Sequence, residues 1–442
     1  MNFNNMKLYQ AIILCCAGWL SVSEASAQER LSLSLAQCRE MALSQSEELQ
    51  QADNRLRQAE LDNEIATTAY LPKIDGSAIG VYMLPDMDMM GMDLRMRGTY
   101  MAGINLTQPI YTGGKITTGK RLARIGGEVA REQQRMRRMD VLVEADKAYW
   151  TYIAVARKIR MLESFSTQMD TLYRQVSAAC RAGMTTENDL LRIEAERSDV
   201  LYQLQKAKNG EDLCRMSVCR IIGVGFDTSI EPTDTLITFS EPTPLSTDIS
   251  SRPEMSLLEK QIKADKQQIR MAKADMLPTV GLTAGYMYYG NIKLEGMTAT
   301  ADGTSQPFSQ EFRDGQWTAM LSVSIPIFHW GENRKKVRKA RYQLKNSELE
   351  LQKNTRLINI EVQQSIRNMQ DGQRLVQTAE TGLCQAKENL RVTQNRYASS
   401  VAPLSDLLDA QSQWQQAESN LIEAQTQCKI YETEYLRATG KL

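Results

Sequence analysis

The 442-residue sequence contains one histidine, His329, and lacks the short motifs on which many enzymes depend. It has no Gly-rich phosphate loop, no Gly-x-Ser-x-Gly elbow and no His-Glu-x-x-His pair. A single imidazole with no ligand motif beside it is a poor start for a catalytic triad or a metal centre. We therefore predict that the chain is not an enzyme and has no catalytic residue, metal site or cofactor.

The chain also lacks an excess of charge, because 53 Lys and Arg residues balance 53 Asp and Glu residues. Since nucleic-acid binding requires a basic surface, nucleic acid is not expected as a partner. Cysteine is sparse and without the paired spacing of a metal site. Disulfides remain an alternative in an exported chain, but small buried apolar positions are favoured. Six cysteines follow the first segment: Cys38, Cys180, Cys214, Cys219, Cys384 and Cys428.

Long hydrophobic runs are missing except at the start of the chain. There, Lys7 precedes an apolar run over residues 11–20, and Ala25-Ser26-Ala27 fits a cleavage site. This pattern predicts a secretory signal peptide over residues 1–27. No later stretch reaches the ~18 apolar residues that a membrane-spanning helix requires. If the exported chain enters a membrane, it does so as strands.

Proline is absent from residues 110–231, 327–402 and 404–442, which are rich in strong helix formers. One helix over residues 114–180 would be about 100 Å long at 1.5 Å per residue. The pair Gly126-Gly127 is the expected place for a bend. After Pro403, and again from Leu190, apolar residues recur at alternating spacings of three and four, which is typical of coiled coils.

Other segments alternate between apolar and small or polar residues, as β-strands with one apolar face do. Residues 279–288, 317–327 and 100–110 show this pattern clearly, and residues 72–83 show it more weakly. Each run has about the ten residues of a tilted membrane strand. On the apolar phase, aromatic and aliphatic residues are predicted to face lipid: Tyr100, Tyr286, Tyr288, Trp317 and Leu321.

The sequence is internally duplicated. Leu71-Pro72 matches Leu277-Pro278, while Pro109-Ile110-Tyr111 matches Pro326-Ile327-Phe328 at an offset of 217 positions, the same offset as from Asp189 to Asp406. We predict a first repeat over residues 28–223, with a strand pair at about 72–110 and long helices at about 114–222. A linker over 224–252 contains a candidate short strand at 236–239. The second repeat covers 253–442, with strands at about 278–328 and helices at about 331–439.

Four strands cannot close a membrane barrel, for which about eight is the lower limit. Open strand edges in lipid leave backbone groups unpaired, at several kcal/mol each. The chain is therefore expected to form an oligomer that supplies the missing strands.

The duplicated order of these features resembles the outer-membrane efflux protein family of TolC-like channels. A Pro-Ile-aromatic segment followed by glycine stands at each strand-to-helix join, and Asp-Leu-Leu follows each distal turn. The resemblance implies a mainly α fold with membrane strands: a homotrimer with a twelve-stranded β-barrel, four strands per chain, and a long periplasmic coiled-coil barrel.

The same resemblance implies a conduit in the outer membrane of a Gram-negative bacterium that extends into the periplasm. Its partners would be outer-membrane lipid, a periplasmic adaptor and an inner-membrane pump of the RND, ABC or MFS type. A passive pore or structural protein without a pump is the alternative, although a barrel alone needs no ~100 Å helices. A soft-metal (Cu/Ag) channel is another, because a Met-rich loop contains thioether ligands. Mobile loop filler is favoured for its members: Met87, Met89, Met90, Met92 and Met96.

Gly183 and Pro403 are helix breakers, so the chain is expected to reverse beside them. We predict that the two turns contact the adaptor: Gly183, Met184 and Thr185 in the first repeat, and Ser400, Val401 and Ala402 in the second.

Asp406 and Asp409 lie three residues apart on one predicted helical face, and Asp189 is the repeat counterpart of Asp406. Considered alone, they are helix caps or partners of the helix dipole. The resemblance instead implies that they form the periplasmic constriction, with Tyr397 helping to hold it shut. The arginine expected at Ala402 is missing, and its candidate substitutes are Arg181, Arg192 and Arg396.

Overall fold

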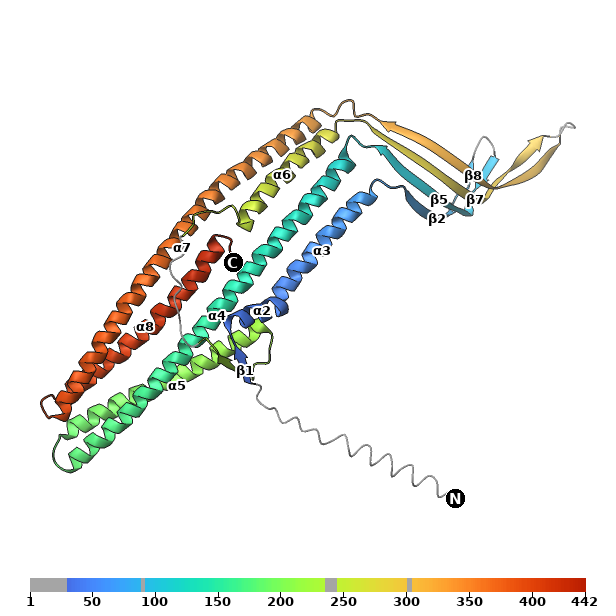
Figure 1. Cartoon of the computed structure of the whole chain (residues 1–442). Helices are drawn as coiled ribbons and strands as arrows, with labels where there is room; N and C mark the ends of the chain where they lie inside the picture. Colours follow the sequence, from blue (N-terminus) through green and yellow to red (C-terminus); the bar gives the residue numbers. More distant parts are fainter. Residues whose placement is uncertain (1–29, 89–91, 235–244, 300–303) are drawn as a thin grey trace, which may run out of the picture. The chain divides into compact units, whose positions relative to one another are not determined.

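A computed structural model describes residues 30–88, 92–234, 245–299 and 304–442 (Figure 1). The predicted signal peptide, Met89, Met90 and the candidate strand at 236–239 lie outside these residues. The chain divides into two compact units, one of residues 1–50, 137–251 and 358–442, the other of 51–136 and 252–357. Each unit draws on both predicted repeats, so the repeats are not separate compact bodies.

The elements follow one another in two similar series of helix, strands and long helices. In chain order they are β1 (Arg30–Leu33), α2 (Leu35–Gln45), α3 (Glu47–Thr68), β2 (Lys73–Tyr82), β3 (Met87–Asp88), β4 (Met92–Arg95), β5 (Arg97–Tyr111), α4 (Lys115–Arg181), α5 (Glu187–Ile222), β6 (Ser229–Pro232), α6 (Pro253–Ala274), β7 (Thr279–Ala299), β8 (Ser305–Ser324), α7 (Glu332–Ala398) and α8 (Leu404–Ala438).

Two of the helices are very long, as the scarcity of proline predicts. α4 and α7 have 67 residues each, or about 100 Å at 1.5 Å per residue. α4 continues through Gly126 and Gly127 as one helix, so the chain is not interrupted at the expected bend. None of the helices in the described residues combines the length and apolarity needed to span a membrane.

The second unit contains an antiparallel sheet with the strand order β2-β5-β7-β8, to which β4 and β3 add a short extension. The prediction of four main strands is confirmed. The prediction of ten residues per strand is wrong for β7 and β8, which have 21 and 20 residues. Both continue past a register shift between Tyr289 and Ile292. Asn291 has a φ of 59° there and donates from Nδ2 to the carbonyl oxygens of Arg97 and Gly98.

The register places the five predicted lipid-facing residues on the same face of this sheet. Residues directly opposite each other point to the same side, and the pairs include Tyr286 with Trp317, Ala102 with Tyr288, and Leu282 with Leu321. Trp317 is 80% exposed and Leu321 63%. Tyr288 is only partly exposed, because its hydroxyl accepts a hydrogen bond from Nε of Arg313 at 2.6 Å.

The first unit is built around a buried carboxylate. Arg39 donates to both oxygens of Asp146, at 2.7 and 2.6 Å, and the hydroxyl of Thr433 donates to Oδ2 at 2.6 Å. These contacts tie α2, α4 and α8 together. Cys38, Tyr149 and Val218 pack in the same unit with no exposed surface.

A parallel pair of strands in this unit was not predicted. β1 pairs with β6, which lies within the segment expected to be a linker. The hydroxyl of Tyr149 lies 3.0 Å from the carbonyl oxygen of Leu33 and 2.8 Å from Oδ2 of Asp234, and these two acceptors share its one proton. The hydroxyl of Tyr152 donates to the carbonyl oxygen of Ile230. Burial raises the pKa of both phenols, that of Tyr152 to about 12, so both hydroxyls keep their protons at neutral pH.

The six cysteines among the described residues are free thiols. Cys38, Cys219 and Cys428 are buried, as predicted, whereas Cys180 and Cys214 are partly exposed and Cys384 is exposed. Burial, with a smaller contribution from Asp146, raises the pKa of Cys38 to about 12. Its thiol is therefore inert packing rather than a reactive site.

The two helical turns have the same backbone structure at the offset of 217. Gly183 (φ 73°) and Ser400 (φ 57°) are both left-handed. Met184 N donates to Ala179 O and Val401 N to Arg396 O, both at 2.8 Å. These bonds close Schellman motifs, which favour glycine at the left-handed position. Ser400 therefore carries a conformational cost that Gly183 avoids.

Replacing Ser400 with glycine is expected to raise the free energy of unfolding by about 0.5–1 kcal/mol, because a non-glycine residue in the left-handed region costs roughly 1–2 kcal/mol. Gly183→Ser should lower it by about 1 kcal/mol for the same reason. Thermal melting of the purified protein would measure both. Ser399→Gly is the matched control, since Ser399 is not among the residues with positive φ. A Ser400→Gly protein that melts below the parent would contradict this account.

Candidate functional site at the helical turns

The turn between α4 and α5 is capped by threonines. Thr186 is the N-cap of α5 and accepts a hydrogen bond from the backbone N–H of Asp189. Oδ2 of Asp189 in turn accepts from the hydroxyls of Thr185, at 2.7 Å, and Thr186, at 2.9 Å. These bonds hold the pKa of Asp189 below its usual range. Asp189 is therefore an ionised capping residue with half of its carboxylate already engaged.

The turn between α7 and α8 lacks this cap, because Pro403 occupies the position of Thr186. Asp406 accepts a 3.4 Å hydrogen bond from the hydroxyl of Ser405 and is exposed, as is Asp409. The duplicated aspartates thus differ: Asp189 is engaged within its own turn, whereas Asp406 and Asp409 present carboxylates to solvent.

The predicted adaptor-contact residues also differ in how available they are. Met184 is 83% exposed and Val401 is 65% exposed, so each turn presents one large apolar side chain. Ala402 is 8% exposed, and Thr185 is hydrogen-bonded to Asp189. Gly183 and Ser400 shape the backbone.

A cleft of about 510 Å³ lies between residues 192–199 of α5 and residues 405–409 at the start of α8. Burial raises the pKa of Glu196, and the neighbouring carboxylates of Asp199 and Asp409 raise it further. Sequence reasoning missed Glu196 and Asp199, because only folding brings α5 beside Asp409. The lining residues are Arg192, Ala195, Glu196, Asp199, Ser405, Leu408 and Asp409.

Arg192 connects the two groups of carboxylates. Its charge contributes to the lowered pKa of Asp189, and its side chain lines the cleft that contains Asp409. Of the three arginines considered as substitutes for the missing one at Ala402, Arg192 is the one placed beside these aspartates.

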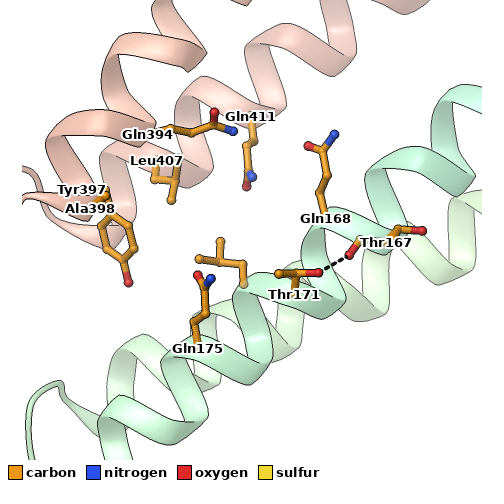
Figure 2. Close-up of a pocket in the computed structure, with 10 residues that line it drawn as sticks. Thr167, Gln168, Thr171, Gln175, Gln394, Tyr397, Ala398, Leu407 and Gln411 are labelled. Carbon is orange, nitrogen blue, oxygen red and sulfur yellow. Dashed lines mark hydrogen bonds between the residues drawn. The ribbon is translucent and has the colours of Figure 1, made fainter.

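A second pocket, of about 380 Å³, lies between α4 and the α7–α8 turn (Figure 2). Figure 2 shows Gln168 and Gln175 from α4 and Gln394 and Gln411 from α7 and α8 around the gap. Tyr397 lines the same pocket, where burial and then the charge of Asp189 raise its pKa. Tyr397 is thus a neutral hydroxyl between the two turns.

Gln411 has the smallest exposed fraction of the polar residues that line this pocket. It is 3% exposed, and its Oε1 has no hydrogen-bond partner among the described residues. In the sequence, Gln411 stands out as a polar residue in the mostly apolar coiled-coil series that follows Pro403. A leucine at this position would bury no polar atom, whereas Gln411 buries an amide oxygen that accepts no hydrogen bond from any described residue.

No group of three His, Cys, Asp or Glu side chains within the described ranges is placed to hold a metal ion. Of the Met-rich loop, Met87 is 49% exposed and Met92 is partly buried.

Long paired helices joined to four antiparallel strands with one apolar face define the class of channel whose strands enter the outer membrane and whose helices extend into the periplasm. The outer membrane efflux protein family model matches residues 38–211 and 245–441, and the chain belongs to this family. It is a TolC-like outer-membrane efflux channel and is not an enzyme. Membership implies a trimeric channel that works with an adaptor and a pump.

Curated relatives and solved structures agree with this assignment. The chain is 24% identical to the outer membrane protein TolC of Escherichia coli K12, covering 99% of this chain and 87% of TolC. It is 22% identical to the efflux protein BepC of Brucella suis, covering 86% and 79%. The fold is similar to the CmeC channel of Campylobacter jejuni (18% identity, 92% and 85% covered, TM-score 0.74) and to open MtrE of Neisseria gonorrhoeae (18%, 92% and 88%, 0.75).

Gln411→Leu is expected to raise the free energy of unfolding by about 1 kcal/mol, because a buried polar atom without a partner costs roughly 1–3 kcal/mol. Denaturant or thermal unfolding of the purified protein would measure the change. Gln385→Leu is the control, since Gln385 is exposed and is the repeat counterpart of Gln168; it should change stability by less than about 0.5 kcal/mol. Destabilisation by Gln411→Leu would mean that its amide is satisfied in the folded protein.

Proposed function

We propose that this channel receives its cargo at the two helical turns and controls passage there with exposed carboxylates. The observation that carries the proposal is the pairing of an exposed apolar tip, Met184 or Val401, with aspartates in the helix that follows. In a trimer, three copies of each turn would surround one axis. Cargo would enter from an adaptor and an inner-membrane pump of the RND, ABC or MFS type.

Asp406 and Asp409 are the residues best suited to line the constriction. They are exposed, and Pro403 provides no side-chain cap that would compete for the Asp406 carboxylate. Glu196 and Asp199 extend the acidic surface to α5. Since rings of carboxylates favour cations in a narrow pore, the closed entrance would pass small cations in preference to anions.

Tyr397 and Asp189 would stabilise the closed state of the constriction. The charge of Asp189 acts on the hydroxyl of Tyr397, although the two residues come from different turns. Arg192 lies beside Asp189 and faces the cleft of Asp409. It would take the part of the arginine missing at Ala402 and cross-link the turns by charge while the pore is closed.

The apolar face of the sheet would face outer-membrane lipid. Tyr100 and Tyr286, 41% and 36% exposed, share this face with Trp317, and the rings of Tyr286 and Trp317 lie 5.0 Å apart. The opposite face carries Asn105, Thr283 and Ser322. Exposed aromatic rings on an otherwise aliphatic face suit the boundary between lipid and water.

The double variant Asp406→Ala with Asp409→Ala should weaken cation preference, because it removes six carboxylates from a closed trimer. Tyr397→Phe with Asp189→Ala should raise the resting conductance, since it removes the electrostatic interaction between the Asp189 carboxylate and the Tyr397 hydroxyl. Planar-bilayer recordings of ion selectivity and conductance would measure both.

Asp371→Ala with Glu380→Ala is the control for charge, because both residues are exposed on α7 away from the turns. If the two turn variants match the parent in selectivity and conductance, the aspartates are helix caps only.

A negative charge at the tips should block coupling to the adaptor. Met184→Glu with Val401→Glu is expected to reduce efflux in cells to the level of a deletion strain while the trimer still assembles, because burying an unpaired charge in an interface costs several kcal/mol. Met184→Leu with Val401→Ile keeps the apolar surface and should retain efflux. Full efflux by the glutamate variant, measured as dye or drug accumulation, would place the adaptor elsewhere.

A further inference from the structure

The start of α7 carries a concentration of positive charge in a chain that is neutral overall. Six of the eight residues from 334 to 341 are Arg or Lys, and all six are exposed. Lys336 pairs with Glu332 at 2.7 Å. The nearby carboxylate of Asp275 is engaged by Lys115 at 2.6 Å. Five cations have no ion pair within the part of the chain that the structure describes: Arg334, Lys335, Arg338, Lys339 and Arg341.

The fold itself does not require these charges. α4 begins in the same way as α7: Thr118 N donates to Gly114 O and Lys335 N donates to Gly331 O, both at 3.0 Å. At the offset of 217, however, Arg334 and Lys335 correspond to Thr117 and Thr118. The first repeat also has cations near its helix start, because Arg121 and Arg124 correspond to Arg338 and Arg341. The same backbone is nevertheless built with Thr117 and Thr118 beside the join, so Arg334 and Lys335 serve another purpose.

The basic run adjoins the apolar end of the membrane sheet. Arg334 lines a hollow of about 300 Å³ together with Ile327, Phe328 and His329. Ile327 is 91% exposed, and Phe328, 66% exposed, lies 5.0 Å from the ring of Trp330. Exposed aliphatic and aromatic side chains next to cations suit the boundary between acyl chains and phosphate headgroups.

Arg338 lies one helical turn beyond Arg334, and Arg341 and Lys345 continue the line at spacings of three and four. From the first residue of α7 to Arg341 is about 14 Å along the axis. The first half of this line therefore stays within about a Debye length, ~8–10 Å, of a headgroup layer at the end of β8.

We propose that the join between β8 and α7 is a binding site for anionic phospholipid in the periplasmic leaflet of the outer membrane. The phosphate would be held by Arg334, Lys335 and Arg338, with the acyl chain against Ile327 and Phe328. The inference rests on the proposed lipid face of the sheet, and it adds that the lipid bound at the join has an anionic headgroup. Each trimer would have three such sites at the level where strands become helices.

Two other occupants are less well matched. An acidic wall polymer would account for the cations but not for Ile327 and Phe328 in the same hollow. A second copy of the chain offers Glu60, Asp62 and Glu64 on α3, which a closed trimer would bring towards α7. Glu60 already pairs with Arg131, at 3.8 Å.

The test is lipid binding by the assembled trimer in nanodiscs of phosphatidylcholine with and without phosphatidylglycerol. Native mass spectrometry would count retained phosphatidylglycerol, and thermal melting during titration with short-chain phosphatidylglycerol would give its affinity. Arg334→Thr with Lys335→Thr, the residues of the first repeat, should weaken binding on the order of 30-fold at low salt, since each cation near a charged surface contributes about fivefold. High salt should abolish the difference.

Lys353→Thr with Arg356→Thr is the control, because these cations are exposed on α7 about 30 Å beyond its first residue. It should bind phosphatidylglycerol like the parent, as should the charge-preserving Arg334→Lys with Lys335→Arg. Equal binding by the threonine variant and the parent would overturn the proposal, as would an equal loss in the control.

Two further results would also overturn it. If the threonine variant loses only binding to purified cell-wall polymer, the occupant is the polymer. If it loses only trimer stability, with lipid binding per trimer unchanged, the cations pair with a second copy. Leu321→Arg tests the proposed lipid face separately, since it should impair assembly in any lipid; normal assembly of that variant would reject the strand orientation and leave the phosphatidylglycerol measurement standing.

Discussion

Backbone groups at a strand edge cannot remain unpaired in lipid, and this constraint governs the whole molecule. Among the residues that the structure describes, β2 pairs with β5 alone and β8 with β7 alone, so both outer edges of the four main strands are open there. The trimer that membership of the family implies supplies further strands for these edges. Because α4 and α7 follow β5 and β8 in the chain, each of these helices is present three times in the trimer.

Duplication gives this chain one backbone and two sets of side chains. The turns share their left-handed residue and hydrogen bonds, and the strand-to-helix joins do the same, with Gly113 (φ 61°) matched by Trp330 (φ 49°). Yet Thr186 corresponds to Pro403, and Arg192 to Asp409. The two repeats share a backbone because the packing of helices and the hydrogen bonds of the turns and joins determine it. The divergent side chains distinguish a capped aspartate from two exposed ones, and a helix start with Thr117 and Thr118 from one with Arg334 and Lys335.

The sequence alone determined the architecture because its signals are periodic and long. Alternation over residues 317–327 indicates a strand with one apolar face, and β8 follows it as far as Ser324. A run of 67 residues rich in helix formers and without proline indicates one long helix. The match at an offset of 217 then located equivalent turns and joins. The apolar tips Met184 and Val401 were likewise found from helix breakers, which are local properties. Asp406 and Asp409 looked like helix caps from spacing alone, and only the family resemblance assigned them to a constriction.

The tertiary structure decided what depends on neighbours distant in sequence. The β1–β6 pair joins residues about 200 positions apart through four residues each, too short for a periodic signal. Glu196 became part of the acidic site only when α5 packed beside Asp409, and Arg192 was singled out from three arginines in the same way. Gln411 was visible as a polar residue, but its unpaired oxygen was not. The burial of a side chain and its distance from other charges depend on neighbours from several helices and strands. No single stretch of sequence contains those neighbours.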